Sequence, residues 1–166
     1  MSKTLEERLN LVEIRVQSIE DELAIQRLIA SYGPTVDSGQ SQAAAELWKA
    51  DGTYDVGGMG ASVGTSAIEA LFEGEQHQGL IRGGAGHVLN QPWVRVEQDS
   101  ATAIGYSVVF KWDGAAFVVF RVSANKWELE RSPAGWKIVR RTNRLLNGAE
   151  EARLLLGTVG KTRPMP

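Results

Sequence analysis

Two histidines are the side chains of this sequence best suited to proton transfer, because an unperturbed imidazole titrates between about pH 5 and 8. His87 opens a predicted strand after a glycine-rich turn, and Asp37 follows an otherwise apolar helical segment. A carboxylate that accepts a hydrogen bond from one imidazole nitrogen fixes the tautomer and raises the basicity of the other nitrogen. We therefore predict that His87 and Asp37 form a proton-handling pair; the alternative is a hydrogen-bonded structural histidine.

The other histidine and a tyrosine support weaker predictions. His77 lies in a polar stretch, so we expect a solvated loop residue. Tyr32 could donate a hydrogen bond to a carbonyl or leaving oxygen, and the alternative is a tyrosine of the core. Its distance of five residues from Asp37 separates the two side chains by about 140° in a regular helix. Both can face one pocket only if Pro34 kinks the chain.

Several other chemistries lack support in the sequence. The absence of cysteine excludes disulfides, thiolate metal sites and thiol nucleophiles. The two histidines are distant from each other and form no metal-binding motif with a glutamate. The glycines between Gly57 and Gly64 lack the spacing of a phosphate-binding loop, so we interpret them as turn residues. We predict a protein that uses neither a metal nor a cofactor.

The charge of the chain argues against nucleic acid and anionic membranes as partners. Lys and Arg number 18 and Asp and Glu number 20, which gives a net charge of −2, whereas both partners require a basic excess. We interpret the basic run Lys137, Arg140, Arg141 and Arg144 as a solvated segment whose cations pair with carboxylates. No stretch approaches the roughly 20 apolar residues of a membrane span, and the first residues lack a secretory signal. We expect a cytoplasmic protein.

The elements that must position these residues begin with a long amphipathic helix. Apolar residues recur at alternating spacings of four and three from Leu5 to Leu23, as in a coiled-coil seam. This stripe could pack on its own domain or across a subunit boundary; we favour its own domain, with a contribution to a homo-oligomer, a dimer or trimer. Gly33-Pro34 predicts an interruption of the helix, with a change of direction or a kink. The segment Glu73–Gly86, rich in glycine and polar residues, is predicted to be a mobile loop.

The second half of the chain is predicted to be almost entirely strand. Asp113-Gly114 is the strongest hairpin signal, and two further turns complete an antiparallel meander. Such a sheet can be covered on one face by the N-terminal helices, which predicts an α+β architecture. We assign residues 1–148 to one domain that includes the long helix, and 149–166 to a C-terminal helix and tail. The predicted strands are His87–Val96, Ala101–Trp112, Phe117–Arg131 and Trp136–Asn143.

The order of these elements resembles the SnoaL-like branch of the nuclear transport factor two superfamily. The resemblance covers roughly residues 5–143. It implies a cone-shaped, cystatin-like α+β barrel, in which a curved mixed or antiparallel sheet wraps on the N-terminal helices and encloses a pocket. The features that carry the resemblance are Leu23–Leu28, Tyr32, Asp37, the strand after Asp51-Gly52-Thr53, the strand that opens with His87, Ala101–Ala103 and Gly135–Ile138.

Within that superfamily the functional likeness is to the cofactor-free dehydratases and eliminating lyases, namely scytalone dehydratase, bile-acid 7α-dehydratase and hexachlorocyclohexane dehydrochlorinase. The resemblance matches their aspartate and histidine to Asp37 and His87, and the tyrosine of the two dehydratases to Tyr32. The dehydrochlorinase has a lysine in place of that tyrosine and an arginine that matches Arg131. Scytalone dehydratase has a second pocket histidine, for which the strand Val108–Lys111 offers no counterpart. The resemblance also implies that one strand face points into the pocket, namely Asn125, Trp127, Leu129 and Arg131.

These residues lead to the hypothesis of a cofactor-independent acid/base enzyme, a dehydratase or eliminating lyase, acting on a small apolar substrate. His87, oriented by Asp37, would remove a proton, while Tyr32 or Arg131 stabilises the oxygen or leaving group. An isomerase or cyclase is the runner-up. A non-catalytic binding module for an apolar metabolite and a structural oligomer are the rivals from other classes. The residues expected to contact a ring-shaped substrate, with core packing as the alternative, are Trp48, Tyr54, Trp93, Phe110, Asn125 and Trp127.

Overall fold

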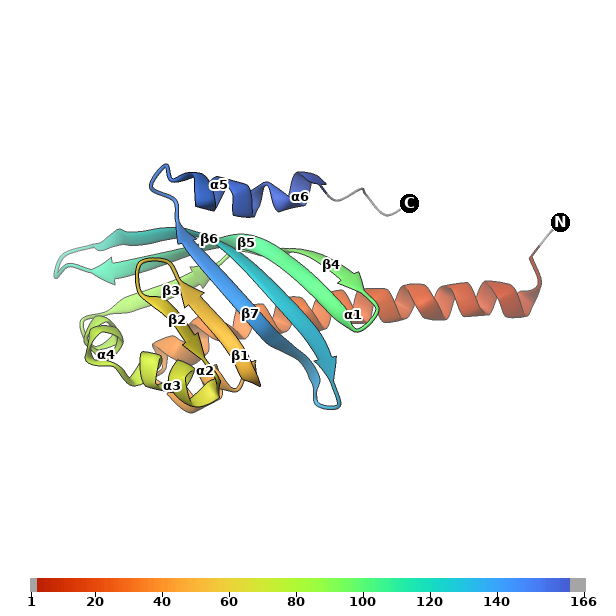
Figure 1. Ribbon diagram of the computed structural model, residues 1–166, viewed down its shortest axis with the longest axis horizontal. Helices are drawn as coiled ribbons and strands as arrows, with labels where there is room; N and C mark the ends of the chain where they lie inside the picture. The colour runs from red at the N-terminus through yellow and green to blue at the C-terminus, as the bar shows by residue number, and fades with distance from the viewer. Residues whose placement is uncertain (1–2, 162–166) are drawn as a thin grey trace.

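The computed structural model describes residues 3–161, and its longest element is helix α1, Leu5–Asp37. The helix begins at a capping box, in which Thr4 and Glu7 each accept a hydrogen bond from the other's backbone N–H. Its first half extends away from the rest of the molecule (Figure 1), and its first buried residue is Asp21. The apolar stripe from Leu5 to Leu23 is exposed, so the expectation that it packs on its own domain is wrong.

Helix α1 continues through Pro34 as far as Asp37, so the predicted interruption of the helix is also wrong. Proline leaves the carbonyl of Ala30 without its usual N–H donor. Both Pro34 and Ala30 are exposed, and water can satisfy that carbonyl. The backbone N–H of Ser38 donates to the carbonyl of Pro34 and closes the last turn. Water can therefore replace the hydrogen bond that the proline removes.

Seven strands form one curved mixed sheet in the order β2-β1-β7-β6-β5-β3, with β4 also paired to β5. Strands β1 and β7 are parallel, and the other pairs are antiparallel. The predicted hairpin at Asp113 is confirmed, because its carboxylate accepts from the N–H groups of Ala115 and Ala116. The strands are β1 Trp48–Val56, β2 Gly60–Val63, β3 Ala85–Leu89, β4 Trp93–Glu97, β5 Ser100–Trp112, β6 Phe117–Ser132 and β7 Gly135–Leu145.

The predicted strand His87–Val96 is two strands, and the break reverses the faces of its side chains. His87 and Leu89 in β3 pair with Val109 and Ser107 of β5. If this pairing continued without a break, Trp93 would lie opposite residue 103 of β5. Trp93 lies opposite residue 104 instead, so the segment that joins β3 to β4 contains one extra residue. Because side chains alternate along a strand, this insertion turns Trp93 to the face opposite to that of His87.

The mobile loop predicted between Glu73 and Gly86 is a helix, α4, Glu75–Arg82. It follows α3, Thr65–Glu73, directly. The carbonyl of Phe72 near the end of α3 accepts hydrogen bonds from Nδ1 of His77 and Nε2 of Gln78, and these two bonds tie the helices together. Polar residues that suggested a solvated loop thus hold a helical corner.

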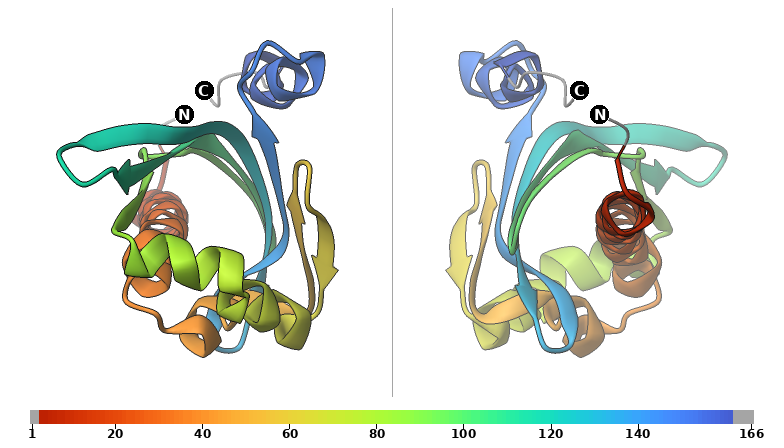
Figure 2. Two further views of the ribbon diagram at one scale, coloured as in Figure 1. Left: turned by 90° about the vertical axis from the view of Figure 1, so that its left-hand side faces the viewer. Right: turned by 90° about the vertical axis from the view of Figure 1, so that its right-hand side faces the viewer.

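The helices occupy both faces of the sheet. Helix α1 and the short helices α2, Ser41–Ala45, α3 and α4 lie on the concave side, whereas α5, Glu150–Leu156, and α6, Thr158–Lys161, lie on the convex side (Figure 2). The core fills the space between α1, α3 and the concave face, with Ile25, Ile29, Ile68, Trp127 and Ile138 among its buried residues. The α+β class, the long N-terminal helix and the curved mixed sheet confirm the predicted fold class, but the described part of the sheet does not close into the predicted barrel. The assignment of residues 149–166 to a separate tail remains a prediction, and 162–166 lie outside the described residues.

Candidate active site

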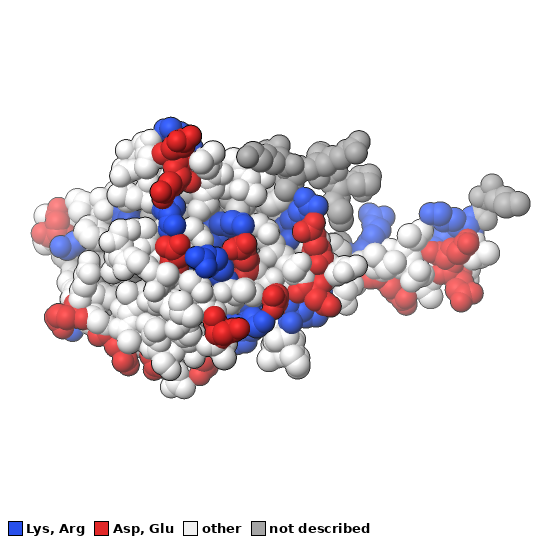
Figure 3. Space-filling model, viewed as in Figure 1, with Lys and Arg blue, Asp and Glu red and all other residues white. Residues whose placement is uncertain are grey.

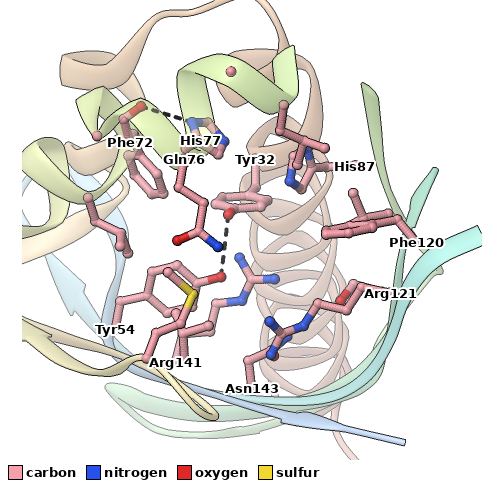
Figure 4. A pocket seen from close by; sticks show the side chains of 18 of the residues that line it. Tyr32, Tyr54, Phe72, Gln76, His77, His87, Phe120, Arg121, Arg141 and Asn143 are labelled. Atoms are coloured by element: carbon pink, nitrogen blue, oxygen red, sulfur yellow. Dashed lines mark hydrogen bonds between the residues drawn. The ribbon is translucent and has the colours of Figure 1, made fainter. Parts of the chain in front are cut away.

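A cavity of about 530 Å³ lies between α1, α4 and the concave face of the sheet, at the end opposite to the projecting half of α1 (Figure 4). Its wall is mostly apolar, with a few polar side chains that converge on it, as is typical of sites for small organic molecules. The apolar lining comes from the sheet, α3 and α4, namely Val56, Met59, Leu71, Phe72, Leu80, Leu89, Val109 and Phe120.

His87 lines this cavity, and Asp37 lies behind it. The Nδ1 atom of His87 is 2.5 Å from Oδ1 of Asp37, and the backbone N–H of His87 donates to Oδ2 of the same carboxylate at 2.7 Å. Two bonds to one carboxylate fix both the ring and the strand that carries it. Because Oδ1 can only accept from an N–H on Nδ1, the Nε2 atom of His87 is left to interact with a ligand.

A glycine permits this contact between α1 and β3. A Cβ atom added at Gly33 would lie 2.1 Å from the backbone oxygen of His87, so only glycine allows the helix to come this close. The approach brings Asp37, one turn further along α1, against the first residues of β3. Asp37 therefore needs no kink at Pro34 to take part in the site, because it reaches His87 and not the cavity itself.

Tyr32 lines the cavity next to the His87–Asp37 pair. Its ring centroid lies 6.3 Å from that of His87, and its hydroxyl is 3.4 Å from the hydroxyl of Tyr54, which also lines the cavity. Burial raises the pKa of Tyr32 well above its ordinary value, and the neighbouring Tyr54 adds to the rise. Tyr32 is consequently a neutral phenol that can donate its proton in a hydrogen bond.

His77 is a second histidine of the cavity, and the expectation of a solvated loop residue is wrong. It belongs to α4, is half-buried, and its ring centroid lies 5.5 Å from that of His87. Its Nδ1 is 2.8 Å from the carbonyl oxygen of Phe72 and must carry a proton, whereas its buried Nε2 has no hydrogen-bond partner among residues 3–161. Burial lowers the pKa of His77. The ring therefore offers a free lone pair near neutral pH.

Arg141 of β7 is a cavity residue that the sequence analysis missed. Only 1% of its surface is exposed, although we had interpreted the run that contains it as solvated. One extra residue at Val139, between the pairs Leu129–Ile138 and Glu128–Arg140, changes the alternation of β7. Arg140 therefore points outward and Arg141 inward. A bulge of this kind depends on strand pairing, so no local sequence signal reveals it.

Arg131, which we predicted to act in the site, lies elsewhere. Its guanidinium binds both carboxylate oxygens of Asp21 at 2.7 Å, contacts Asp99 and stacks on Trp136 at 4.6 Å. Asp21 stands sixteen residues before Asp37 on α1, which corresponds to about 24 Å along the helix axis. Arg131 shares the concave face with the cavity residues but meets α1 at the other end of the sheet.

The predicted substrate-contacting residues divide into three groups. Tyr54 lines the cavity. Trp48 and Trp127 are buried in the core, and Asn125 lies beneath the cavity wall, where it binds Ser107 and Arg141. Trp93 and Phe110 do not line the cavity. The break before β4 turns Trp93 to the other face of the sheet. Phe110 points to that other face as well, because it alternates with Val109 and Lys111, which line the cavity.

A serine motif in β2 does not form a hydrolase site. Gly60–Gly64 reads Gly-Ala-Ser-Val-Gly, the spacing of the turn that exposes a nucleophilic serine in many hydrolases. Ser62 is instead an interior strand residue opposite Tyr54, and in residues 3–161 no hydrogen bond joins it to a histidine. Within the same residues no group of three or more His, Cys, Asp or Glu side chains is placed to hold a metal ion. No described helix is both long and apolar enough to cross a membrane.

The SnoaL-like domain family matches residues 17–142, which is most of the chain and contains Asp37, His87 and Arg141. The chain belongs to the SnoaL-like domain family. This family includes cofactor-free enzymes such as isomerases and dehydratases. The chain matches no curated protein sequence.

Solved structures agree with this membership. A protein from Novosphingobium aromaticivorans, described as NTF2-like with a cystatin-like fold, is 44% identical, and the match covers 94% of this chain and 99% of that one with a TM-score of 0.87. A second protein from Novosphingobium aromaticivorans, provisionally assigned as an aromatic ring hydroxylase, is 26% identical over 77% of this chain and 90% of that one, with a TM-score of 0.62. A protein of unknown function from Mycobacterium tuberculosis, 22% identical, shares the fold over 89% of this chain and 88% of that one, with a TM-score of 0.71.

Proposed function

We propose that this SnoaL-like protein is a cofactor-independent acid/base enzyme, a dehydratase or eliminating lyase, acting on a small organic molecule with a largely apolar body. The observation that supports this proposal is the 2.5 Å contact between Nδ1 of His87 and Oδ1 of Asp37 at the wall of an apolar cavity. A general base must be held in one orientation with one nitrogen free, and this contact supplies both conditions.

The proposed reaction begins with proton abstraction. Nε2 of His87 removes a proton from a carbon next to an activating carbonyl group, and Asp37 stabilises the imidazolium that forms. The neutral phenol of Tyr32 donates a hydrogen bond to the oxygen that gains charge. The carbon–oxygen bond at the neighbouring carbon then breaks, and the leaving hydroxyl takes the proton from His87. The products are an alkene and water, and the enzyme returns to its starting protonation state.

His77 favours an isomerase as the second candidate. Its free Nε2 and its ring distance of 5.5 Å from His87 provide two proton acceptors in one cavity. A substrate without a leaving group could lose a proton to Nε2 of His87 and take the same proton back at another carbon, which moves a double bond, while Nε2 of His77 accepts a hydrogen bond from the substrate. The two candidates share the first step and differ in whether water is released.

The experiment is a screen of cyclic β-hydroxyketones and β,γ-unsaturated ketones in D₂O, with mass spectrometry to detect water loss and deuterium uptake. We expect turnover of at least one class, and His87→Asn should lower the rate by about 10² to 10⁴ while ligand affinity changes little. Asp99→Asn, an exposed carboxylate outside the cavity, is the control and should keep full activity. A loss of affinity without any wild-type turnover would instead identify a binding module.

We also infer that the protein forms a homo-oligomer through α1. The stripe of α1 residues at heptad spacing leaves apolar side chains exposed, among them Leu9 at 56% and Ile19 at 59%. A single helix gains little from such a stripe, whereas a second copy can bury it. Sedimentation velocity should give a dimer or trimer for the wild type and a smaller species for Val12→Asp/Val16→Asp. A wild-type monomer at micromolar concentration would contradict the inference.

A further inference from the structure

The wall of the cavity contains an arginine whose charge no carboxylate of the described residues compensates. Arg141 donates from Nε and Nη2 to the amide oxygen of Asn125, at 3.1 and 3.0 Å, and its buried Nη1 has no hydrogen-bond partner in the described part of the chain. An arginine cannot shed its charge by losing a proton. A buried cation without an anion is costly, so proteins usually place a carboxylate beside it.

Aromatic rings supply part of the missing compensation. The guanidinium carbon of Arg141 lies 4.1 Å from the ring centroid of Tyr32, 4.9 Å from that of Tyr54 and 5.3 Å from that of Trp127. Ring faces attract a cation but accept no strong hydrogen bond in the plane of the guanidinium. Nη1 consequently keeps its capacity to donate, and Figure 4 shows the side chain reaching from the sheet toward Tyr32 in the cavity.

Cationic side chains predominate among the charged residues that line the cavity. Arg121 donates to Ser123, Asn143 and the carbonyl of Gly57, which are all neutral, and Lys111 also lines the wall. Among the described lining residues the only carboxylate is Glu75, which is exposed and paired with Arg82 outside the cavity. The outer surface in Figure 3, by contrast, carries both signs side by side. Positive charge is therefore concentrated where the ligand binds.

We infer that the ligand of this cavity is an organic anion, with a carboxylate seated on Nη1 of Arg141 and an apolar, ring-sized body against the aliphatic wall. This deepens the proposed function, because it assigns a substrate class to the same site. The ring of Tyr32 lies between Arg141 and His87. Its centroid is 4.1 Å from the guanidinium carbon of Arg141 and 6.3 Å from the ring centroid of His87. A carboxylate on Arg141 thus leaves a carbon further along the molecule within reach of Nε2 of His87.

The test compares two probes of the same shape that differ in charge, 2-naphthoate and 2-naphthalenemethanol, by titration calorimetry. The wild type should bind 2-naphthoate about 10- to 100-fold more tightly, the range expected for a hydrogen bond to a charged group. Arg141→Gln should abolish this preference. Arg140→Gln removes the same charge from the adjacent, outward-facing position of β7 and should leave the preference unchanged.

The comparison within the wild type decides the inference even if Arg141→Gln does not fold. Equal affinities for the two probes, a preference for the alcohol, or no binding of 2-naphthoate at millimolar concentration would each overturn it. A preference that survives in folded Arg141→Gln would overturn the assignment to Arg141. His87→Asn separates this inference from the proposed function, because it should lower turnover by about 10² to 10⁴ and keep the preference for 2-naphthoate. If His87→Asn remains active while the preference is present, the proposed function fails and the anion site stands.

Discussion

Two carboxylates of helix α1, Asp21 and Asp37, contact the sheet, and their hydrogen-bond partners differ in whether they can exchange a proton. Asp21 is bound by the Arg131 guanidinium through both oxygens and by Nε1 of Trp136 at 3.1 Å. Asp37 is bound by the ring and backbone N–H of His87. A guanidinium keeps its protons at any physiological pH, whereas an imidazole exchanges its proton. The first arrangement can only hold the helix on the sheet, while the second can also perform chemistry.

The surroundings extend this contrast. Each nitrogen that donates to Asp21 belongs to a side chain outside the cavity, namely Gln17, Arg131 and Trp136. Around the His87–Asp37 pair, Nε2 of His77 and Nη1 of Arg141 are buried and have no hydrogen-bond partner within the residues that the structure describes. Unsatisfied polar atoms in a native structure often mark a place where a ligand completes the hydrogen bonds. A polar cluster whose hydrogen bonds are all made within the protein is therefore weaker evidence for a binding site than a cluster with buried polar atoms that lack a partner.

The largest expected effect comes from Gly33→Ala, which breaks the Asp37 region and leaves Asp21 unaffected. The added methyl group would lie 2.1 Å from the carbonyl oxygen of His87, so α1 and β3 must separate. We expect a loss of about 3 kcal/mol or more in unfolding free energy, at the upper end for overpacking, together with loss of turnover. Urea unfolding measures the first quantity. Gly86→Ala, whose Cβ meets nothing within 4 Å, is the matched control and should cost less than about 1 kcal/mol.

Asp21→Asn should have the next largest effect, and it should act on stability alone. It removes the charge that holds Arg131, and we expect a loss of about 1 to 3 kcal/mol in unfolding free energy, because Asp21 is buried and Arg131 is partly exposed. Turnover should stay within twofold of the wild type. Asp99→Asn removes an exposed carboxylate from the same arginine and should cost at most about 0.5 kcal/mol. A large loss of activity in Asp21→Asn would erase the distinction between the two regions.

The smallest expected effect is that of acid on the unfolding free energy, which the two regions should lower in different pH ranges. The hydrogen bonds from Arg131 hold the pKa of Asp21 below its ordinary value of 3.8, so its contribution is complete well above that pH and is lost as the pH falls through and below it. Burial lowers the pKa of His77 below 6.5, so its protonation begins to favour the unfolded chain as the pH falls below 6.5. Unfolding free energies measured from pH 8 to 3 should show both ranges. Asp21→Asn should reduce the pH dependence of the unfolding free energy only in the more acidic range, and His77→Asn should reduce it only in the range just below pH 6.5. The opposite result would contradict the account.

The sequence predicted the fold well because the fold depends on patterns that are local. The hairpin at Asp113 and the apolar repeat of α1 are visible within a few residues, and the order of elements resembles one family. The exposed stripe at Leu9 shows the limit of that reasoning, since the repeat predicts an apolar face but not what covers it. The His87–Asp37 contact was also predicted, on the basis of residue chemistry and family resemblance together.

The rest of the site could not be predicted because it depends on interruptions of regular pairing. One extra residue before β4 turns Trp93 away, and one at Val139 turns Arg141 inward. His77 reaches the cavity only because α4 forms, and α4 is tied to α3 through the carbonyl of Phe72. Such features follow from tertiary contacts, so a periodicity read along one segment assigns these side chains to the wrong face or to solvent.

The most direct test of the central claim is the ¹⁵N and ¹H nuclear magnetic resonance spectrum of the histidine side chains in the full-length protein. We predict a strongly deshielded proton on Nδ1 of His87, shared with Asp37, that is retained in His77→Asn and absent in Asp37→Asn. A spectrum without that proton, or one in which Asp37→Asn leaves it unchanged, would contradict the pairing from which the proposed chemistry follows.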